Sequence, residues 1–251
     1  MKNKIFINII IRSFCLFCSL LNSTIIEIKQ DGQGDYQVIQ EGIDASANSD
    51  TVLVHPGTYN ENINFNGHHI TLASLELLTG NRSYIDSTVI NGNQTGSCIR
   101  LDDEEQDVLI QGFSITNGSG SETAGGVRGG GILFYTSIFD DYRISATVRN
   151  CYIFDNYAGS GGGMCIRMSD IFLSGIRIID NYASGGGGIL SRDDCHLDFD
   201  DQNLCNIYNN YGESGCDIAA IDAENDIHVI VDTFTVAEYD DYFASYNYDI
   251  Q

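Results

Sequence analysis

DNYAGSGGGMCIRMSD (residues 155–170) is followed twenty-five residues later by a near repeat, DNYASGGGGILSRDD (residues 180–194). Shorter forms of the same turn recur along the chain at spacings of 25, 26, 39, 25 and 29 residues. They centre on Asn66, Asn91, Asn117, Asn156, Asn181 and Asn210. A period near 25 residues is typical of a solenoid, in which each repeat buries its apolar face against its neighbours. The repeats contain short apolar runs and no helical pattern, so the sequence predicts an all-β solenoid.

The lengths of the apolar runs favour about three strands per coil. Equivalent strands of successive coils would then pair in parallel, about 4.8 Å apart. Because side chains alternate along a strand, each strand would supply one inward layer. We expect one such layer to contain Ile132, Met164, Ile189 and Ile218, and a second to contain Ile115, Phe154, Ile179 and Tyr208.

The recurring Asn has a structural explanation. Asn tolerates the left-handed backbone conformation of a sharp turn, and stacked Asn amides can hydrogen-bond from coil to coil. We therefore interpret the six Asn residues as a structural turn ladder. The Gly runs let the chain bend tightly and pack closely, and no helix follows them as a phosphate-binding loop would require.

The N-terminus, MKNKIFINIIIRSFCLFCSLLNST, resembles a secretory signal, with basic residues before an apolar run. We expect residues 1–23 to be a cleaved signal and the mature chain to be secreted, with no membrane span. An uncleaved anchor or a wrongly chosen start are the alternatives. Cleavage would leave 9 basic against 35 acidic residues, a formal charge of −26. Such a chain would repel nucleic acid, so we expect no nucleic-acid partner.

Residues 31–67, DGQGDYQVIQEGIDASANSDTVLVHPGTYNENINFNG, resemble the opening of right-handed parallel β-helix proteins of the pectin-lyase-like superfamily. The resemblance covers about residues 31–235 and implies an N-terminal cap at 24–50 and a β-helix over 51–251. The superfamily includes lyases, hydrolases, esterases, epimerases and adhesins, so fold alone does not assign an activity. The likeness is greatest to secreted bacterial surface proteins whose β-helix continues into an anchoring module, which leaves open that the chain is a fragment.

The motifs of the related enzymes are not found. GTYNE (57–61) fits the opening of pectin methylesterases, but their catalytic segments are missing and the chain has no Trp. Pectate lyases need a basic residue and calcium, and after signal removal the only Lys is Lys29. Polygalacturonases use paired carboxylates; RDDCH (192–196) offers such a pair without the basic motif that should follow it.

An outward column of basic residues is the best candidate site. Alignment of SCIRLDD (97–103), ILFY (132–135), MCIRMSD (164–170) and ILSRDD (189–194) predicts a ladder suited to binding an extended acidic glycan. Its expected residues are Arg100, Tyr135, Arg167 and Arg192, flanked by Asp170 and Asp194. The alternative is an Arg and Asp column that only neutralises itself.

Other chemistry has weaker signals. We expect no cofactor, although the acid runs DDEEQD (102–107) and EYDDY (238–242) leave calcium open. Six Cys residues follow the signal and permit three disulfides without fixing any pairing; they are Cys98, Cys151, Cys165, Cys195, Cys205 and Cys216. The sequence thus favours a secreted or cell-surface binding or structural module for extracellular carbohydrate. A polysaccharide-active enzyme that uses the Arg and Asp column is the alternative.

Overall fold

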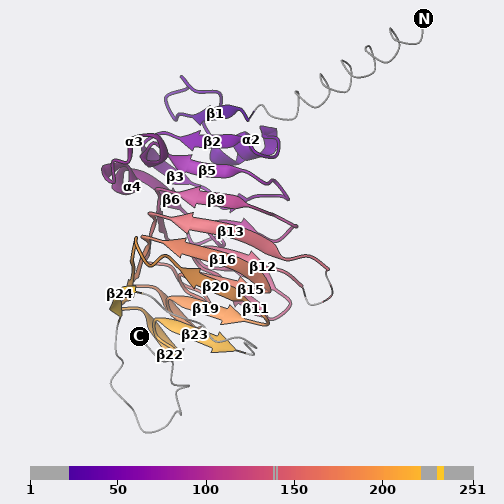
Figure 1. Ribbon diagram of the computed structural model, residues 1–251, viewed down its shortest axis with the longest axis vertical. Helices are drawn as coiled ribbons and strands as arrows, with labels where there is room; N and C mark the ends of the chain where they lie inside the picture. Colours follow the sequence, from indigo (N-terminus) through magenta and orange to yellow (C-terminus); the bar gives the residue numbers. More distant parts are fainter. Residues whose placement is uncertain (1–22, 138, 140, 222–230, 235–251) are drawn as a thin grey trace, which may run out of the picture.

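The computed structural model describes residues 23–137, 139, 141–221 and 231–234. The predicted signal segment lies almost wholly outside this part of the chain, as does the acid run at 238–242. The described chain winds into a right-handed parallel β-helix with three sheets per coil, which confirms the predicted fold. In Figure 1 the coils stack along the long axis from β1 to β23. No helix among the described residues is long and apolar enough to cross a membrane.

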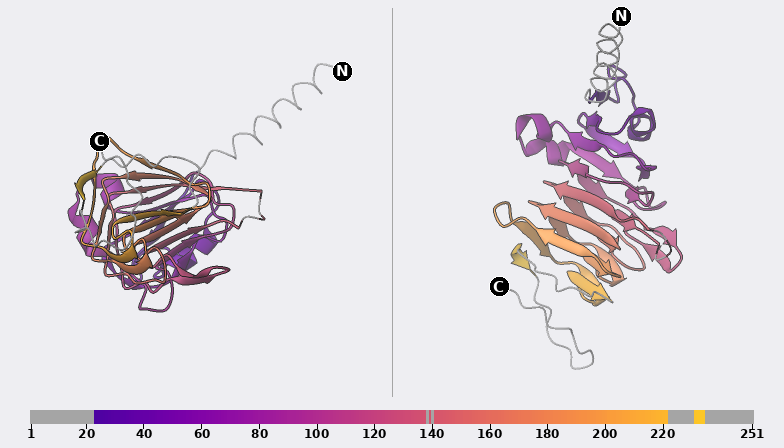
Figure 2. Two further views of the ribbon diagram at one scale, coloured as in Figure 1. Left: turned by 90° about the horizontal axis from the view of Figure 1, so that it is seen from below. Right: turned by 45° about the vertical axis from the view of Figure 1, so that its right-hand side comes forward.

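Each coil contributes one strand to each of three sheets, which we call sheets A, B and C. Viewed along the long axis (Figure 2), the sheets surround the interior. Sheet A contains β1 (Ile25–Ile28), β2 (Thr51–Val54), β5 (Thr71–Ser74), β8 (Val108–Gln111), β13 (Ile144–Arg149), β16 (Ser169–Ser174) and β20 (His196–Phe199). Sheet B contains β3 (Gly57–Asn60), β6 (Thr88–Asn91), β9 (Ser114–Thr116), β14 (Tyr152–Phe154), β17 (Arg177–Ile179), β21 (Cys205–Tyr208) and β24 (Val231–Phe234). Sheet C contains β4 (Ile63–Asn64), β7 (Ile99–Leu101), β12 (Ile132–Tyr135), β15 (Met164–Arg167), β19 (Ile189–Arg192) and β23 (Ile218–Ile221).

Smaller elements decorate the coils. Between sheets B and C, β10 (Ser121–Thr123) and β11 (Gly126–Arg128) form an antiparallel hairpin. In later coils the same region contains the parallel pair β18 (Tyr182–Gly185) and β22 (Tyr211–Ser214). Two short helices, α3 (Glu76–Thr79) and α4 (Ser83–Ser87), connect sheet A to sheet B in one coil.

The N-terminal cap combines a strand with a helix. β1 pairs in parallel with β2, so sheet A begins within the segment predicted as the N-terminal cap. Helix α2 (Ile39–Ala45) buries Ile39 and Ile43 in the core. Its N-terminus is satisfied from the next coil, because both carboxylate oxygens of Glu61 accept backbone N–H groups of α2 at 3.0 Å. The GTYNE segment therefore has a structural role: it supplies Glu61 and the buried Tyr59.

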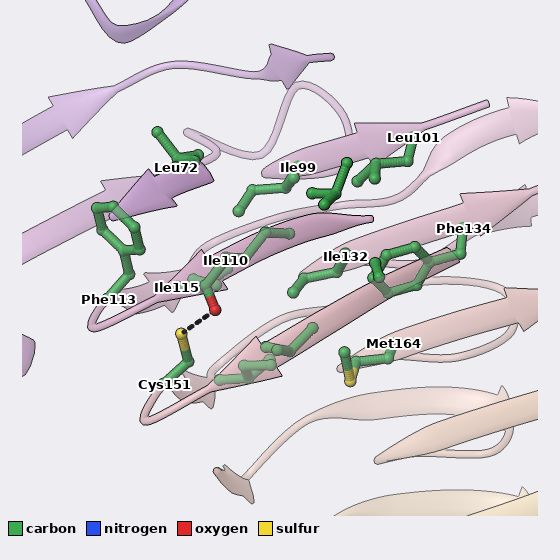
Figure 3. Close-up of a cluster of buried hydrophobic side chains, with 14 of the residues drawn as sticks. Leu72, Ile99, Leu101, Ile110, Phe113, Ile115, Ile132, Phe134, Cys151 and Met164 are labelled. Carbon is green, nitrogen blue, oxygen red and sulfur yellow. Dashed lines mark hydrogen bonds between the residues drawn. The ribbon is translucent and has the colours of Figure 1, made fainter. Parts of the chain in front are cut away.

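The core consists of stacked columns of mostly aliphatic side chains, with a few Phe and Cys side chains among them (Figure 3). In sheet C, Ile132 pairs with Met164, Met164 with Ile189, and Ile189 with Ile218, and all four side chains are buried. This confirms the first predicted inward layer. Burial of apolar area at about 25 cal/mol per Å² makes each such column a main source of stability.

In the second predicted layer Ile115 is inward as predicted, but the other three members are wrong by one residue. In sheet B the buried column is Ile90, Ile115, Ile153, Ile178 and Ile207. Phe154, Ile179 and Tyr208 are only half-buried and lie on the outer face. The prediction aligned Asn117 with Asn156, whereas Asn117 is equivalent to Asp155, and a one-residue slip exchanges the two faces of a strand.

A buried Asn column follows sheet B, and it has three of the six predicted members. Asn156 Nδ2 donates to Asn181 Oδ1, and Asn181 Nδ2 donates to Asn210 Oδ1, each over 2.9 Å. Asn210 Nδ2 in turn donates to Asp217 Oδ1. Each Asn amide also donates to two backbone carbonyls, as for Asn181 to Ile153 and Ile179. The column thus joins the three coils that contain Asn156, Asn181 and Asn210.

Asn66, Asn91 and Asn117 lie outside this column. Asn66 and Asn117 instead adopt left-handed conformations, with φ of 50° and 57°. Asn91 lies in β6 and pairs with Thr116. The two properties that make Asn suitable, amide stacking and tolerance of positive φ, therefore act at neighbouring positions: at 155, 180 and 209, the residue before each ladder Asn has the positive φ.

The Gly runs permit close backbone stacking. A Cβ atom at Gly163 would lie 2.6 Å from the carbonyl oxygen of Gly188, and one at Gly162 would lie 2.5 Å from that of Gly187. Real Cβ atoms do not approach that closely, so these positions require Gly.

The six Cys residues in the described part of the chain are free thiols. Cys151 and Cys205 are separated by the intervening coil, in which Ile176 occupies the equivalent inward position. Burial raises the pKa of Cys98, Cys151 and Cys165 to about 12. These thiols therefore pack as small apolar residues and are poor nucleophiles near neutral pH.

Candidate functional site

A groove of about 410 Å³ lies on the outer face of sheet A. Its floor is a column of half-buried side chains in register, Leu109, Thr147 and Phe172, from β8, β13 and β16. Period-2 alternation produces this floor, because the inward positions between these residues are buried in the core. The volume is in the range of small-ligand sites. The groove thus offers a flat apolar strip across three coils.

Polar groups border the floor on both sides. At the strand starts, Asp107, Ser145 and Asp170 form one row, and the backbone N–H of Asp107 donates to Ser145 Oγ over 2.8 Å. At the other side is Arg149, the last residue of β13. Among the described residues no carboxylate lies within ion-pair distance of Arg149 and no side chain accepts its hydrogen bonds. An electrostatic partner of Arg149 is Asp200, whose pKa is lowered by hydrogen bonds and further by the charge of Arg149. The groove therefore presents one guanidinium with its donors available.

Arg143 joins the predicted residues Asp170 and Asp194 at the edge of the groove. Its Nη2 lies 2.6 Å from Asp170 Oδ1, and its Nη1 lies 3.0 Å from Asp194 Oδ2. His196 Nδ1 is 2.8 Å from the same Asp170 oxygen. Burial acts to raise the pKa of Asp170, but hydrogen bonds from Arg143 and His196 outweigh it and hold the pKa below its ordinary value. Asp170 is thus an ionised hydrogen-bond acceptor near neutral pH.

The RDDCH segment turns the chain from sheet C into sheet A. Asp193 and Asp194 both have positive φ, 54° and 44°, so their adjacent carboxylates point to different partners. Asp194 binds Arg143, whereas Asp193 Oδ2 accepts from Nε of Arg167 at 2.5 Å and from Nε of Arg192 at 3.2 Å. Cys195 then enters the core. This turn therefore places two ion-pair clusters side by side. One contains Arg143, Asp170 and Asp194, and the other contains Arg167, Arg192 and Asp193.

The predicted basic column exists for three of its four residues. Tyr135 pairs with Arg167, and Arg167 pairs with Arg192. The Arg167 guanidinium carbon lies 5.0 Å from the centre of the Tyr135 ring, in cation–π geometry. Only 11% of the Arg167 side chain is exposed, against 24% for Arg192. Arg192 is therefore the more accessible cation of the column.

The placement of Arg100 corrects the prediction. Arg100 pairs with Leu133, two residues before Tyr135, and forms an ion pair with Asp102 in its own coil. The tripeptide CIR occurs at both 98–100 and 165–167, and aligning the two places Arg100 two residues from its actual register. A two-residue slip keeps a side chain on the same face, so the inward and outward pattern could not detect it.

Sequence reasoning missed three arginines: Arg128, Arg143 and Arg149. The sequence pattern could have identified Arg149, because in ISATVR (144–149) every second residue is polar and Arg149 continues that outward row. Arg128 ends β11 and Arg143 directly precedes β13, two strands that the repeat alignment did not cover, and no local pattern marks the partners of either residue.

The acid run DDEEQD is occupied by internal contacts. Glu105 is buried, and its carboxylate accepts the backbone N–H groups of Gly67 and Asp103. Within the described part of the chain, no three His, Cys, Asp or Glu side chains converge as a metal site would require.

Comparison with known protein families gave no matching family model, and no curated protein sequence matched. Among solved structures, a pectin methylesterase from Erwinia chrysanthemi is similar at 15% identity and a TM-score of 0.40, covering 70% of this chain and 54% of that chain. The chain thus spans about half the length of that enzyme. A deglycosylated pectin methylesterase from Aspergillus niger gives 12% identity and a TM-score of 0.41, covering 84% of each chain. These values assign no site and no activity to this chain.

Proposed function

We propose that this chain is an extracellular β-helix module that binds an acidic polysaccharide in the groove on sheet A. The observation that carries the proposal is the combination of an apolar floor with the unpaired guanidinium of Arg149 at its side. The formal charge of the chain is −23, so its net charge repels an acidic glycan and long-range electrostatic attraction cannot account for binding. Recognition would depend on local contacts in the groove.

Each part of the groove matches one part of a uronic acid unit. The Phe172 ring and the Leu109 side chain provide a surface for the apolar face of a sugar ring. Asp107, Ser145 and Asp170 provide acceptors and a hydroxyl for sugar hydroxyl groups. Arg149 can pair with a carboxylate in bidentate geometry, which is worth more than a single neutral hydrogen bond. Because the floor crosses three coils at about 4.8 Å each, several sugar units could contact it.

The predicted site residues extend this surface around the corner into sheet C. Asp170 and Asp194 are held by Arg143 at the groove edge, and Arg192 and Tyr135 lie beyond them on the outer face. We include Arg192, Tyr135, Asp170 and Asp194 in the proposed binding surface, with Arg167 as the buried support of the column. Arg100 lies in another column and is outside the proposed site.

A polysaccharide-active enzyme is the second candidate, and the contact between His196 and Asp170 is the observation that favours it. Catalysis of glycosidic bond cleavage by acid requires a carboxyl group that remains protonated near neutral pH. In the two ion-pair clusters, the pKa values of Asp170 and Asp193 are both lowered, which is opposite to the shift that a general acid needs. Binding is accordingly the better-supported function.

A glycan array that includes polyuronates and neutral polysaccharides tests the proposal. Parallel assays for unsaturated and for reducing products, with and without calcium, would separate binding from cleavage. We expect binding to acidic glycans without product release. Binding restricted to neutral glycans, or to none, would contradict the proposal, and product formation would favour the enzyme.

A further inference from the structure

Tyr157, Tyr182 and Tyr211 form a column of stacked rings on the outside of the molecule, which we call the Tyr ladder. The ring centres of Tyr157 and Tyr182 lie 5.3 Å apart with an interplanar angle of 11°, and those of Tyr182 and Tyr211 lie 4.7 Å apart at 5°. Each Tyr directly follows a member of the buried Asn column, so the core fixes the spacing of the rings at one coil. Tyr182 and Tyr211 are also paired in register between β18 and β22.

The Tyr ladder is exposed to solvent. The exposed fractions of Tyr157, Tyr182 and Tyr211 are 56%, 41% and 55%. Three of the nine large hydrophobic residues that are exposed in the described chain therefore lie in one column. In the described structure the three phenol oxygens have no hydrogen-bond partner. A continuous row of exposed aromatic side chains is typical of an interaction surface, where the ring packs and the hydroxyl binds a polar group.

Carboxylates precede and follow the Tyr ladder along the chain. Asp155 and Asp180 each lie two residues before a ladder Tyr, Glu213 lies two residues after another, and all three acids are exposed. Among the described residues no Lys, Arg or His forms an ion pair with any of them. Loss of hydration raises the pKa of Tyr182, and the neighbouring phenol of Tyr211 and the charge of Glu213 raise it further, as expected for a carboxylate near the rings. The ladder is thus an aromatic strip in negatively charged surroundings.

We infer that the Tyr ladder is a docking surface for an extended, Lys- or Arg-rich segment of a partner protein. Charge complementarity points to this occupant, because the acids beside the rings have no internal partner and the whole chain carries a formal charge of −23. A second copy of the chain would bring like charges together. The carboxylates can pair with guanidinium or ammonium groups, and the phenol oxygens can accept their N–H donors.

The rings are ordered before any partner binds. Stacking and the Asn column hold them upright at coil spacing, so little conformational entropy is lost when a segment docks. The ring edges can also pack against the apolar stems of Lys and Arg side chains. The ladder lies at the corner between sheets B and C, whereas the groove lies on the outer face of sheet A, so docking does not require the groove.

The experiment measures the binding of a labelled peptide of alternating Arg and Ser to the full chain by fluorescence anisotropy. Alternate side chains of an extended peptide share one face, so this peptide presents its Arg residues together. An ionic strength of about 0.15 M screens attraction between distant charges. We expect saturable binding of this peptide and none of the same peptide with Glu in place of Arg. Tyr182→Ala, which removes the middle ring, should weaken binding about tenfold.

Two double variants with the same change in charge separate the docking surface from general attraction. Asp155→Asn with Asp180→Asn leaves the rings in place, and Asn suits the positive φ of both positions. Glu41→Gln with Asp86→Asn alters exposed residues of α2 and α4, at the opposite end of the molecule from β22 (Figure 1). The first pair should weaken peptide binding about tenfold, and the second pair by less than about twofold.

Equal weakening by the two double variants would overturn the inference, because it would show attraction to net charge alone. Wild-type affinity of Tyr182→Ala, or no saturable binding by the wild-type chain, would overturn it as well. Sedimentation of the chain without peptide tests the other occupant: self-association that Tyr182→Ala abolishes would assign the ladder to a second copy and overturn the inference. Arg149→Gln should reduce polysaccharide binding and leave peptide binding unchanged, so the two proposals can fail separately.

Discussion

Asn156 and Asn181 are joined amide to amide: Nδ2 of Asn156 donates to Oδ1 of Asn181 over 2.9 Å, within the core and twenty-five residues apart in sequence. The same Asn181 oxygen accepts the backbone N–H of Asn156. One side chain therefore satisfies groups in two coils. Such buried bonds contribute mainly because their loss leaves polar groups unpaired.

Replacement of Asn181 tests this relationship. Asn181→Ala would leave the N–H of Asn156 and the carbonyls of Ile153 and Ile179 without their partner. At about 1–3 kcal/mol for each unpaired group, we expect a loss of about 3–5 kcal/mol in the free energy of unfolding by urea. Asn66→Gly, which keeps an exposed left-handed turn, should cost less than about 1 kcal/mol. Equal losses for the two variants would disprove the role of the ladder.

Gly163 and Gly185 provide a matched pair for the stacked Gly runs. Ala at 163 would collide with the carbonyl oxygen of Gly188, so we expect destabilisation of about 1–3 kcal/mol. Ala at 185 meets nothing within 4 Å, and Gly185 has no positive φ. Gly185→Ala should be neutral or stabilising by up to about 1 kcal/mol. Urea unfolding of both variants measures the difference, and the reverse order would contradict the close stacking.

Asp193 should make stability depend on acid pH. Burial acts to raise its pKa, but the bonds from Arg167 and Arg192 lower it overall. A carboxyl with a lowered folded-state pKa contributes stability that is complete above the unfolded value, about 3.9, and is lost as pH falls through the folded value. Asp193→Asn keeps a residue suited to positive φ and should cost about 1–3 kcal/mol near neutral pH. Unfolding free energies from pH 7 down to pH 2 should converge for wild type and variant; a constant difference would refute the ion pair.

The thiols should differ in reactivity. Cys98, Cys151 and Cys165 are buried with a pKa of about 12, whereas Cys216 is only partly buried. Iodoacetamide at pH 8 should therefore modify Cys216 well before these three, which react only on unfolding. Peptide mass spectrometry of the folded protein would show this order, and prompt labelling of Cys98 would contradict the core packing.

The repeat in residues 155–194 was sufficient to predict the solenoid, its parallel pairing and the inward column through Ile132 and Met164. It could not set the register of sheet B, because each turn contains a residue with positive φ directly before the ladder position. Asn117 is the residue with positive φ in its turn, whereas Asn156 is the ladder residue in its own. The site was harder to predict. Arg100 and Arg167 share a local motif but not a column, and the contacts of Arg143 span fifty-one residues in sequence.

The groove on sheet A is tested most directly by the affinity of the chain for a soluble polyuronate. The wild-type chain should bind it, and Arg149→Gln should weaken binding tenfold or more through loss of a charge-assisted bidentate contact worth about 1.5–3 kcal/mol. Phe172→Ala should weaken it as well, whereas Arg100→Gln should retain wild-type affinity. Equal affinity of wild type and Arg149→Gln for the polyuronate would contradict the proposed site.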